Sequence, residues 1–488
     1  MRVYTDRALD VARGNGASYA DIRITRRVTQ SLQVRNGVIE AVQEQTDEGF
    51  GVRVLVNGAW GFASSYLIEI DEIDRVVIDQ VFRIAEASAL LQRRPVRLGP
   101  RVTSSGRYVT PHQIDPFSVP LEDKLAVLVA ADEAMRRIPG ITITSGNMIF
   151  IREDKTFANS EGAYVEQTIF ESGAGIEATA VAEGEVQRRS YPNTFARHQV
   201  TGGYEAVQGW DLVGHAEQVA EEAVELLSAE VAPEGMFDII LGPTQLALQI
   251  HESCGHPIEL DRVFGTEAAY AGTSFLTPDK YRDFRYGSEL VNIVADATVP
   301  RGLGTFGWDD EGVPAQRTDI IKDGLFVGYL TSRETAQQLH EINPAAPATS
   351  NGTMRADGWN RIPLIRMTNI NLLPGEWEFD DLVADTDRGL YLEMNRSWSI
   401  DDKRLNFQFG TEVAREITGG KFGRLYRNAI YTGITPEFWR RCDAICNERY
   451  WDVWGTPNCG KGQPPQFAHV GHGASPARFR GIRVFGVR

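Results

Sequence analysis

The chain of 488 residues contains only four cysteines, too few for the disulfide framework of a small secreted scaffold. No stretch approaches the roughly 18 apolar residues that a membrane-spanning helix needs, so we expect no membrane association. Residues 1–15 lack the apolar centre of a secretion signal. These absences predict a cytoplasmic protein whose cysteines are free thiols or metal ligands.

Positive charge is also scarce, because 50 Lys and Arg face 66 Asp and Glu, for a net charge of -16. A field of this sign repels phosphate backbones, so we expect no nucleic-acid partner. No repeat or low-complexity tract interrupts the chain. The length and the 42% of hydrophobic residues instead favour a folded protein of two to four domains.

The first half alternates β-rich runs with apolar-periodic helices. Asn36-Gly37 and Asn57-Gly58 each separate two short β-rich runs, which predicts two hairpins. Periodicity predicts helices over 71–84, 121–138 and 212–227, and five prolines predict a long loop over 95–120. The turn cluster at 232–235 places a boundary near residue 230, which predicts domains at 1–230 and 231–488.

The second half opens with a buried strand at 237–241 and a helix with Pro243 in its first turn. Beyond residue 290 we expect short strands and glycine turns, with one clear helix over 436–451. Cys442 and Cys446 lie four apart in that predicted helix and are expected to be core residues. The acidic run at 309–311 is expected to be a solvated turn between strands; the alternatives are a second metal site and a clamp for peptide amines. Arg333 and Glu334 are expected to form a structural ion pair.

The densest cluster of metal-binding residue types is His251-Glu252-Ser253-Cys254-Gly255-His256. Two histidines that bracket a glutamate on a helix are typical of zinc hydrolases, in which the glutamate takes a proton from water. A spacing of five puts the two imidazoles about 140° apart on a regular helix. Gly255 and Pro257 permit a π-type bulge that would bring both imidazoles to one side. We therefore predict a broken or bulged helix at 253–257; the alternative is a helix end with one buried and one solvated histidine.

Two histidines do not complete a catalytic zinc site, which takes three protein ligands and an open position. Glu259 could serve if the chain turns back after His256. Cys459 lies in a glycine-flanked loop, where the neighbouring Lys461 would lower the pKa of its thiol. His469 and His472, among glycines near the end, are further candidates as ligands or as groups that face the substrate.

Several motifs in the same order resemble one family, the TldD/PmbA metallopeptidases, also called the modulator-of-DNA-gyrase family. The resemblance spans nearly the whole chain. The matching segments are 36–37, 49–53, 251–262, 302–307, 309–316, 332–336, 351–355 and 459–461.

The resemblance implies a zinc peptidase of α+β class. Its N-terminal domain is α/β, with hairpins and helices, and its C-terminal domain is mostly antiparallel β and carries the metal-binding helix. The resemblance assigns His251, His256 and Cys459 as zinc ligands and Glu252 as the general base. It also implies a homodimer or a heterodimer with a paralogous subunit, and broad cleavage of extended peptides or unfolded proteins.

A second electrophile is usually needed beside the zinc, and His469, His472 and Arg355 are the candidates. Two other functions stay open. One is a non-catalytic partner subunit with a structural zinc site, and the other is a zinc amidohydrolase that acts on small amides.

Overall fold

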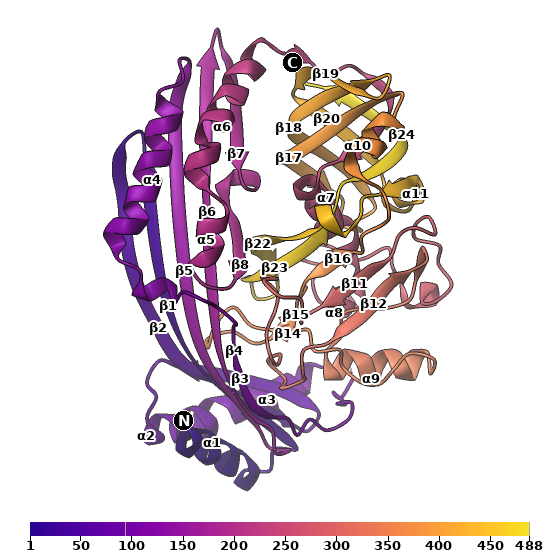
Figure 1. The fold of residues 1–488 in the computed structure, drawn as a ribbon. Helices are drawn as coiled ribbons and strands as arrows, with labels where there is room; N and C mark the ends of the chain where they lie inside the picture. Colours follow the sequence, from indigo (N-terminus) through magenta and orange to yellow (C-terminus); the bar gives the residue numbers. More distant parts are fainter. Residues whose placement is uncertain (93, 488) are drawn as a thin grey trace.

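The computed structural model describes residues 1–92 and 94–487, and Figure 1 shows two β-rich halves side by side. The first half forms an eight-stranded sheet in the order β3-β2-β1-β5-β6-β4, with β7 and β8 paired to β6. Its strands are β1 (Tyr19–Arg35), β2 (Val38–Val56), β3 (Ala59–Ser65), β4 (Ser105–Val109), β5 (Ile141–Asn159), β6 (Tyr164–Ala182), β7 (Glu185–Tyr191) and β8 (His198–Thr201). Its helices are α1 (Arg2–Gly14), α2 (Ile70–Arg75), the π-helical η1 (Val76–Val81), α3 (Phe82–Leu91), α4 (Leu121–Arg136), α5 (Glu205–Gly209) and α6 (Leu212–Ser228).

Both predicted hairpins of the first half are confirmed. Asn36-Gly37 joins β1 to β2, and Asn57-Gly58 joins β2 to β3. The four residues have positive φ angles of 49°, 79°, 51° and 77°. Asparagine and glycine tolerate this left-handed backbone, whose twist matches that of the flanking strands. The local sequence therefore sets the register of three strands.

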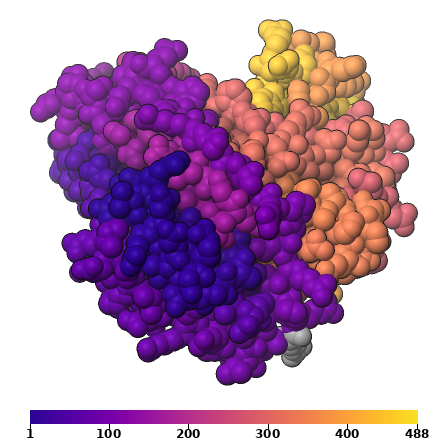
Figure 2. All heavy atoms as spheres, turned by 90° about the horizontal axis from the view of Figure 1, so that it is seen from below, coloured from indigo at the N-terminus to yellow at the C-terminus, as the bar shows by residue number. Residues whose placement is uncertain are grey.

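Strand β1 has one apolar and one charged face, and over residues 19–25 both are buried. Ile22 and Ile24 contribute to the core beneath α1, η1 and α3, while the upper part of the sheet packs against α4 and α6. On the opposite face, Asp21 and Arg23 are 0% and 1% exposed. The second half of the chain covers that face, and Figure 2 shows the two halves in contact when seen from below. Charge buried in this way requires partners: Asp21 pairs with Arg53 of the same sheet, and Arg23 pairs with Asp310 of the covering half.

The second half is built on strands that close into a ring. Strand β17 pairs with β10, β10 with β24, β24 with β20, β20 with β18, and β18 again with β17. All of these pairings are antiparallel except β10–β17. The strands are β9 (Glu230–Val231), β10 (Gly235–Leu241), β11 (Ile293–Asp296), β12 (Arg317–Lys322), β13 (Leu325–Phe326), β14 (Met354–Arg355), β15 (Leu364–Ile365), β16 (Ile370–Leu372), β17 (Arg388–Ile400), β18 (Asn406–Thr418), β19 (Lys421–Arg427), β20 (Ala429–Ile434), β21 (Cys442–Ile445), β22 (Asp452–Lys461), β23 (Gln466–Ala474) and β24 (Ala477–Gly486). The predicted α+β class is confirmed.

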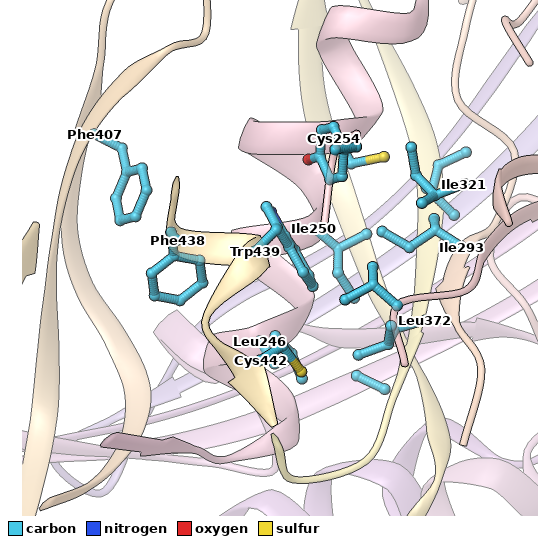
Figure 3. Packing of buried hydrophobic residues seen from close by; sticks show 14 of the residues in the cluster. Leu246, Ile250, Cys254, Ile293, Ile321, Leu372, Phe407, Phe438, Trp439 and Cys442 are labelled. Carbon is cyan, nitrogen blue, oxygen red and sulfur yellow. The ribbon is translucent and has the colours of Figure 1, made fainter. Parts of the chain in front are cut away.

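Helix α7 (Pro243–Ile250) is the central element of this half. Leu246, Ile250 and Cys254 follow one another at four-residue spacing, and Figure 3 shows Ile250 between Trp439 on one side and Ile293 on the other. The other helices of this half are α8 (Leu260–Val263), α9 (Arg333–Ile342), α10 (Phe379–Ala384) and α11 (Thr435–Arg440). None of the described helices is long and apolar enough to cross a membrane. The apolar side of α7 is fixed in the core, so the residues that follow it are held in place.

The predicted helix over 436–451 is wrong. Within this range only α11 (Thr435–Arg440) is α-helical. The chain then enters β21 (Cys442–Ile445), which pairs with β24, and a short 3-10 turn, η7 (Glu448–Tyr450), follows. Cys442 and Cys446 are buried, as expected, but in the strand and directly after it rather than on a helix face. Tertiary pairing with an open edge of β24 overrides the local helical pattern, which a short apolar segment cannot resolve.

Several other elements were not predicted, among them α1, β4 and α9. Helix α1 (Arg2–Gly14) covers β1, and strand β4 (Ser105–Val109) lies within the segment expected to be a loop, where it pairs with β6. Helix α9 (Arg333–Ile342) begins with a capping box, in which the Ser332 side chain accepts from the Thr335 N–H and the Thr335 side chain accepts from the Ser332 N–H. A serine three residues before a second hydroxyl was a signal for this helix.

The acidic run at 309–311 is not a solvated turn, because its three residues are at most 2% exposed. Asp310 accepts hydrogen bonds from Lys155 Nζ at 2.9 Å and from the Ala356 N–H at 2.7 Å, and it pairs with Arg23 at 3.5 Å. The run lies against the charged face of the first sheet. It is buried because its carboxylates pair with cations of that face, such as Arg23 and Lys155. The expected Arg333–Glu334 pair is also wrong, since Arg333 pairs with Glu161 at 2.9 Å.

Candidate metal centre

A π-helical turn, η4 (His251–Gly255), continues α7 and leads into the 3-10 turn η5 (His256–Ile258). The wider turn brings side chains five residues apart to the same side. The imidazoles of His251 and His256 are therefore neighbours, with ring centroids 4.9 Å apart and planes at 88°. A Cβ at position 255 would collide with the sulfur of Met367, so glycine is needed there for close packing. The predicted distortion of the helix is confirmed.

Cys459 reaches these histidines from the far end of the sequence on β22. Its Sγ lies 3.7 Å from His256 Nε2, and one ligand atom from each of His251, His256 and Cys459 falls within 4.8 Å of the others. A sulfur and a nitrogen that share a tetrahedral zinc ion are about 3.6 Å apart. All three side chains are buried. The structure thus places together the three residues expected to bind the metal.

Both histidines are oriented by a second side chain. Glu259 Oε2 lies 2.9 Å from His256 Nδ1, and His472 Nε2 lies 2.8 Å from His251 Nδ1. Because Nδ1 is engaged in each ring, Nε2 is the nitrogen available to a metal ion. Such outer partners fix the ring and its tautomer in metal sites.

The electrostatics favour the metal-binding forms of Cys459 and His256. Burial raises the pKa of the Cys459 thiol, but the two facing histidines and Arg366 outweigh it and lower that pKa well below its ordinary value. Burial lowers the pKa of His256 to about 3, so this imidazole is neutral at physiological pH. Burial also lowers the pKa of His251, but Cys459 and Glu252 together raise it by more, and the net pKa is above the ordinary value. A thiolate and neutral imidazoles are the ligands that a divalent cation takes, and a proton at His251 would leave on binding.

Glu252 borders the same cavity as the three residues, a space of about 280 Å³. Its Oε2 accepts a hydrogen bond of 2.5 Å from Arg404 Nη1, and the two side chains are 8% and 14% exposed. Burial raises the pKa of Glu252, but Arg404, the two histidines and Arg262 together lower it by more, so the net pKa lies below the ordinary value. The carboxylate is therefore charged and able to accept a proton.

Three family models together cover most of the chain. Residues 20–87 match the PmbA/TldA metallopeptidase domain 1, residues 114–229 match the central domain, and residues 234–486 match the C-terminal domain. The C-terminal model alone spans more than half of the sequence. The chain belongs to the PmbA/TldA metallopeptidase family.

Relatives within the PmbA/TldA family match over nearly their whole length. A metalloprotease of Methanocaldococcus jannaschii is 29% identical over 88% of this chain and 90% of its own. A TldD homologue of Haemophilus influenzae, also named a metalloprotease, is 25% identical over 98% of this chain and 95% of its own.

The fold is shared with two crystal structures. One is a proposed modulator of DNA gyrase from Thermotoga maritima, at a TM-score of 0.77 and 17% identity, over 99% of both chains. The other is TldE from Thermococcus kodakarensis, at 0.72 and 15%, again over 99% of both. At these identities the likeness concerns the fold alone.

None of the three expected substrate-facing residues is among the described side chains that line the cavity beside Glu252. His472 is fully buried behind His251. His469 lines other cavities, and its Nδ1 lies 2.6 Å from Glu171 Oε2. The Arg355 guanidinium donates to the backbone carbonyls of Met367 and His469. His469 and His472 are three residues apart on β23, so alternation places their side chains on opposite faces. The family resemblance gave no register for this strand, so the sequence could not show which face each one occupies.

Two positively charged residues differ from expectation. Lys461 does not act on Cys459; its ammonium donates to Asp261 Oδ1 at 2.7 Å and lies 3.4 Å from Glu259. Arg404 was not predicted at all. It follows a turn of charged residues, Asp401-Asp402-Lys403, whose sequence is typical of any exposed hairpin end.

Replacing Glu259 with glutamine is expected to weaken zinc binding by about 10- to 100-fold, because His256 loses the carboxylate that orients its ring. Competition with a fluorescent chelator measures the dissociation constant. Glutamine at the exposed Glu234 is the control and should leave the constant unchanged. An equal constant for the Glu259 variant and the wild type would show that the contact does not tune the ligand.

Proposed function

We propose that the chain is a zinc-dependent peptidase in which His251, His256 and Cys459 hold the metal and Glu252 is the general base. The observation that carries this proposal is the convergence of three ligand atoms at one cavity that Glu252 borders, although Cys459 lies 203 positions after His256. Family membership and the names of the relatives support the metal-dependent activity.

The donor set fits zinc. Two nitrogens and one thiolate are ligands that zinc prefers, and three protein ligands beside a cavity leave a position for water or substrate. Glu259, the other ligand candidate, is engaged with His256 and Lys461 instead. A structural zinc site would be closed by a fourth protein ligand. The open arrangement therefore supports a catalytic role over that of a non-catalytic subunit.

When bound, a zinc ion supplies Lewis acidity, which makes a water more acidic and a peptide carbonyl more electrophilic. Arg404 occupies Oε2 of Glu252, so Oε1 is the oxygen that takes a proton from the attacking water. The water oxygen bonds to the carbonyl carbon, and the carbonyl oxygen gains the negative charge. When the C–N bond breaks, Glu252 returns the proton to the leaving nitrogen. One water is consumed, and a carboxylic acid and an amine are formed.

The strand that carries Cys459 also provides a surface for substrate. Residues 455–460 of β22 line the cavity, and in the described part of the chain β22 pairs only with β23. An extended peptide can add to such an edge through backbone hydrogen bonds, which recognise no particular sequence. We therefore propose extended peptides and unfolded proteins as substrates, with broad specificity. Pairing of the chain with itself or with a paralogous subunit stays a prediction.

Metal removal tests the proposed function. The zinc-loaded protein is expected to cleave casein, to lose this activity after dialysis against a chelator, and to regain it with added zinc. A tightly folded protein should be cleaved far more slowly, because its backbone is not free to pair with β22. Casein cleavage that persists without metal would contradict the proposal. Hydrolysis of small amides but not of casein would favour an amidohydrolase.

A further inference from the structure

The proposed hydrolysis places a negative charge on the carbonyl oxygen of the substrate. Fixed donors that stabilise such a charge are usually the largest single contribution to catalysis. His469, His472 and Arg355 do not border the cavity. The group that meets this charge must therefore be sought among other side chains of the cavity.

Besides its histidines, the described lining of the cavity contains two positively charged side chains, Arg197 and Arg404. Arg197 is exposed on the loop before β8, whereas the Arg404 side chain is only 14% exposed and contacts Glu252. Arg404 is thus the guanidinium that lies directly beside the proton acceptor.

The backbone holds Arg404 in this position. It ends the turn between β17 and β18, in the left-handed conformation with φ at 63°. The carbonyl of Arg404 accepts from Thr435 Oγ1 at 2.9 Å, and the N–H of Leu405 donates to Asp401 Oδ1 at 2.7 Å. Arg262 donates to the carbonyl of Asp402 at 3.1 Å. A strained residue held by its surroundings is common at functional sites.

The guanidinium of Arg404 keeps unused donors. It has five N–H groups, and the hydrogen bond that it makes in the described structure joins Nη1 to Glu252. Its Nε is buried and has no hydrogen-bond partner there. Buried donors are nearly always paired in folded proteins, so an acceptor that enters the cavity would complete the set.

We propose that Arg404 is a catalytic residue of this site, which holds Glu252 through Nη1 and donates from the rest of its guanidinium to the carbonyl oxygen of the peptide substrate. The role rests on the proposed peptidase function. Arg404 is then the second electrophile. Its guanidinium binds the negatively charged oxygen of the transition state more strongly than the neutral carbonyl of the substrate.

Replacing Arg404 with alanine tests this role in the zinc-loaded full chain with an unstructured peptide. We expect kcat to fall by about 100-fold or more, KM to change little, and zinc content to stay that of the wild type. Arg404→Lys should recover part of kcat, since lysine supplies charge but no planar fork. Arg424→Ala removes an exposed arginine that pairs with Glu230 at 3.2 Å and is the control without effect.

Two readouts separate catalysis from a structural role. Added guanidinium chloride at millimolar concentration should restore activity to Arg404→Ala but not to Glu252→Gln. A phosphinic pseudopeptide, whose tetrahedral phosphorus carries charged oxygens, should bind Arg404→Ala about 100-fold more weakly than it binds the wild type. The matching uncharged peptide should bind equally well to Glu252→Gln and to the double variant with both Glu252→Gln and Arg404→Ala.

The proposal is overturned if Arg404→Ala keeps kcat within about threefold, if it loses zinc, or if guanidinium does not rescue it. Wild-type activity that does not follow the metal would instead overturn the peptidase function. Metal-dependent cleavage that needs Glu252 but not Arg404 would overturn the role of Arg404 alone.

Discussion

Glutamine in place of Glu252 is expected to lower kcat for an unstructured peptide by about 10²- to 10⁴-fold, the usual contribution of a positioned general base. The amide has nearly the same shape, and its oxygen can still accept from Arg404 Nη1, so the cavity keeps its form. It cannot take the proton of the attacking water. Initial rates, with zinc content measured on the same samples, give the result.

The control is glutamine at the exposed Glu448, far from the cavity, which should leave kcat and zinc unchanged. Zinc must remain bound to the Glu252 variant, because its carboxylate is not among the three ligand atoms. Full activity of this variant would remove the mechanism even if zinc binds as proposed. Loss of zinc would instead make Glu252 part of the ligand shell.

The second large effect concerns stability. Alanine at Asp310 is expected to destabilise the chain by about 3–5 kcal/mol, because it leaves Lys155 and Arg23 buried without their shared carboxylate. The side chains of Asp310 and Arg23 are each 1% exposed, so water cannot replace the lost partner. Differential scanning calorimetry should show a lower unfolding midpoint.

Alanine at Asp79 is the matched control. Asp79 pairs with Arg83 at 3.8 Å, but both side chains are more than half exposed, and such pairs contribute little. The unfolding midpoint of this variant should equal that of the wild type. If the unfolding midpoint of Asp310→Ala also equals that of the wild type, the ion pairs between the two halves do not stabilise their contact.

The elements that sequence predicted correctly are those fixed by local chemistry. The Asn-Gly pairs at 36–37 and 57–58 determine their hairpins because few other residues accept the left-handed turn. Gly255 and Pro257 similarly indicated the bulge that brings His251 and His256 together. Cys459 was one of several open candidates by its own sequence, and it was chosen through the family resemblance.

The incorrect predictions concern residues whose environment is set by distant segments. The stretch after Arg440 becomes β21 because β24 offers it an edge, and the acidic run at 309–311 is buried because β1 presents charge to it. Arg404 could not be found from its neighbours, since its contact with Glu252 spans 152 positions. Single-sequence patterns report local preference and contain no signal for such contacts.

The hairpin of β22 and β23 supplies both Cys459 and His472, the side chain that orients His251. A polypeptide emerging from the ribosome therefore has no complete cation site until residues 452–474 have been made and have docked onto α7. Under the proposed function, the nascent enzyme is harmless to its own unfolded stretches up to that point, because proteolytic competence arrives only with this hairpin.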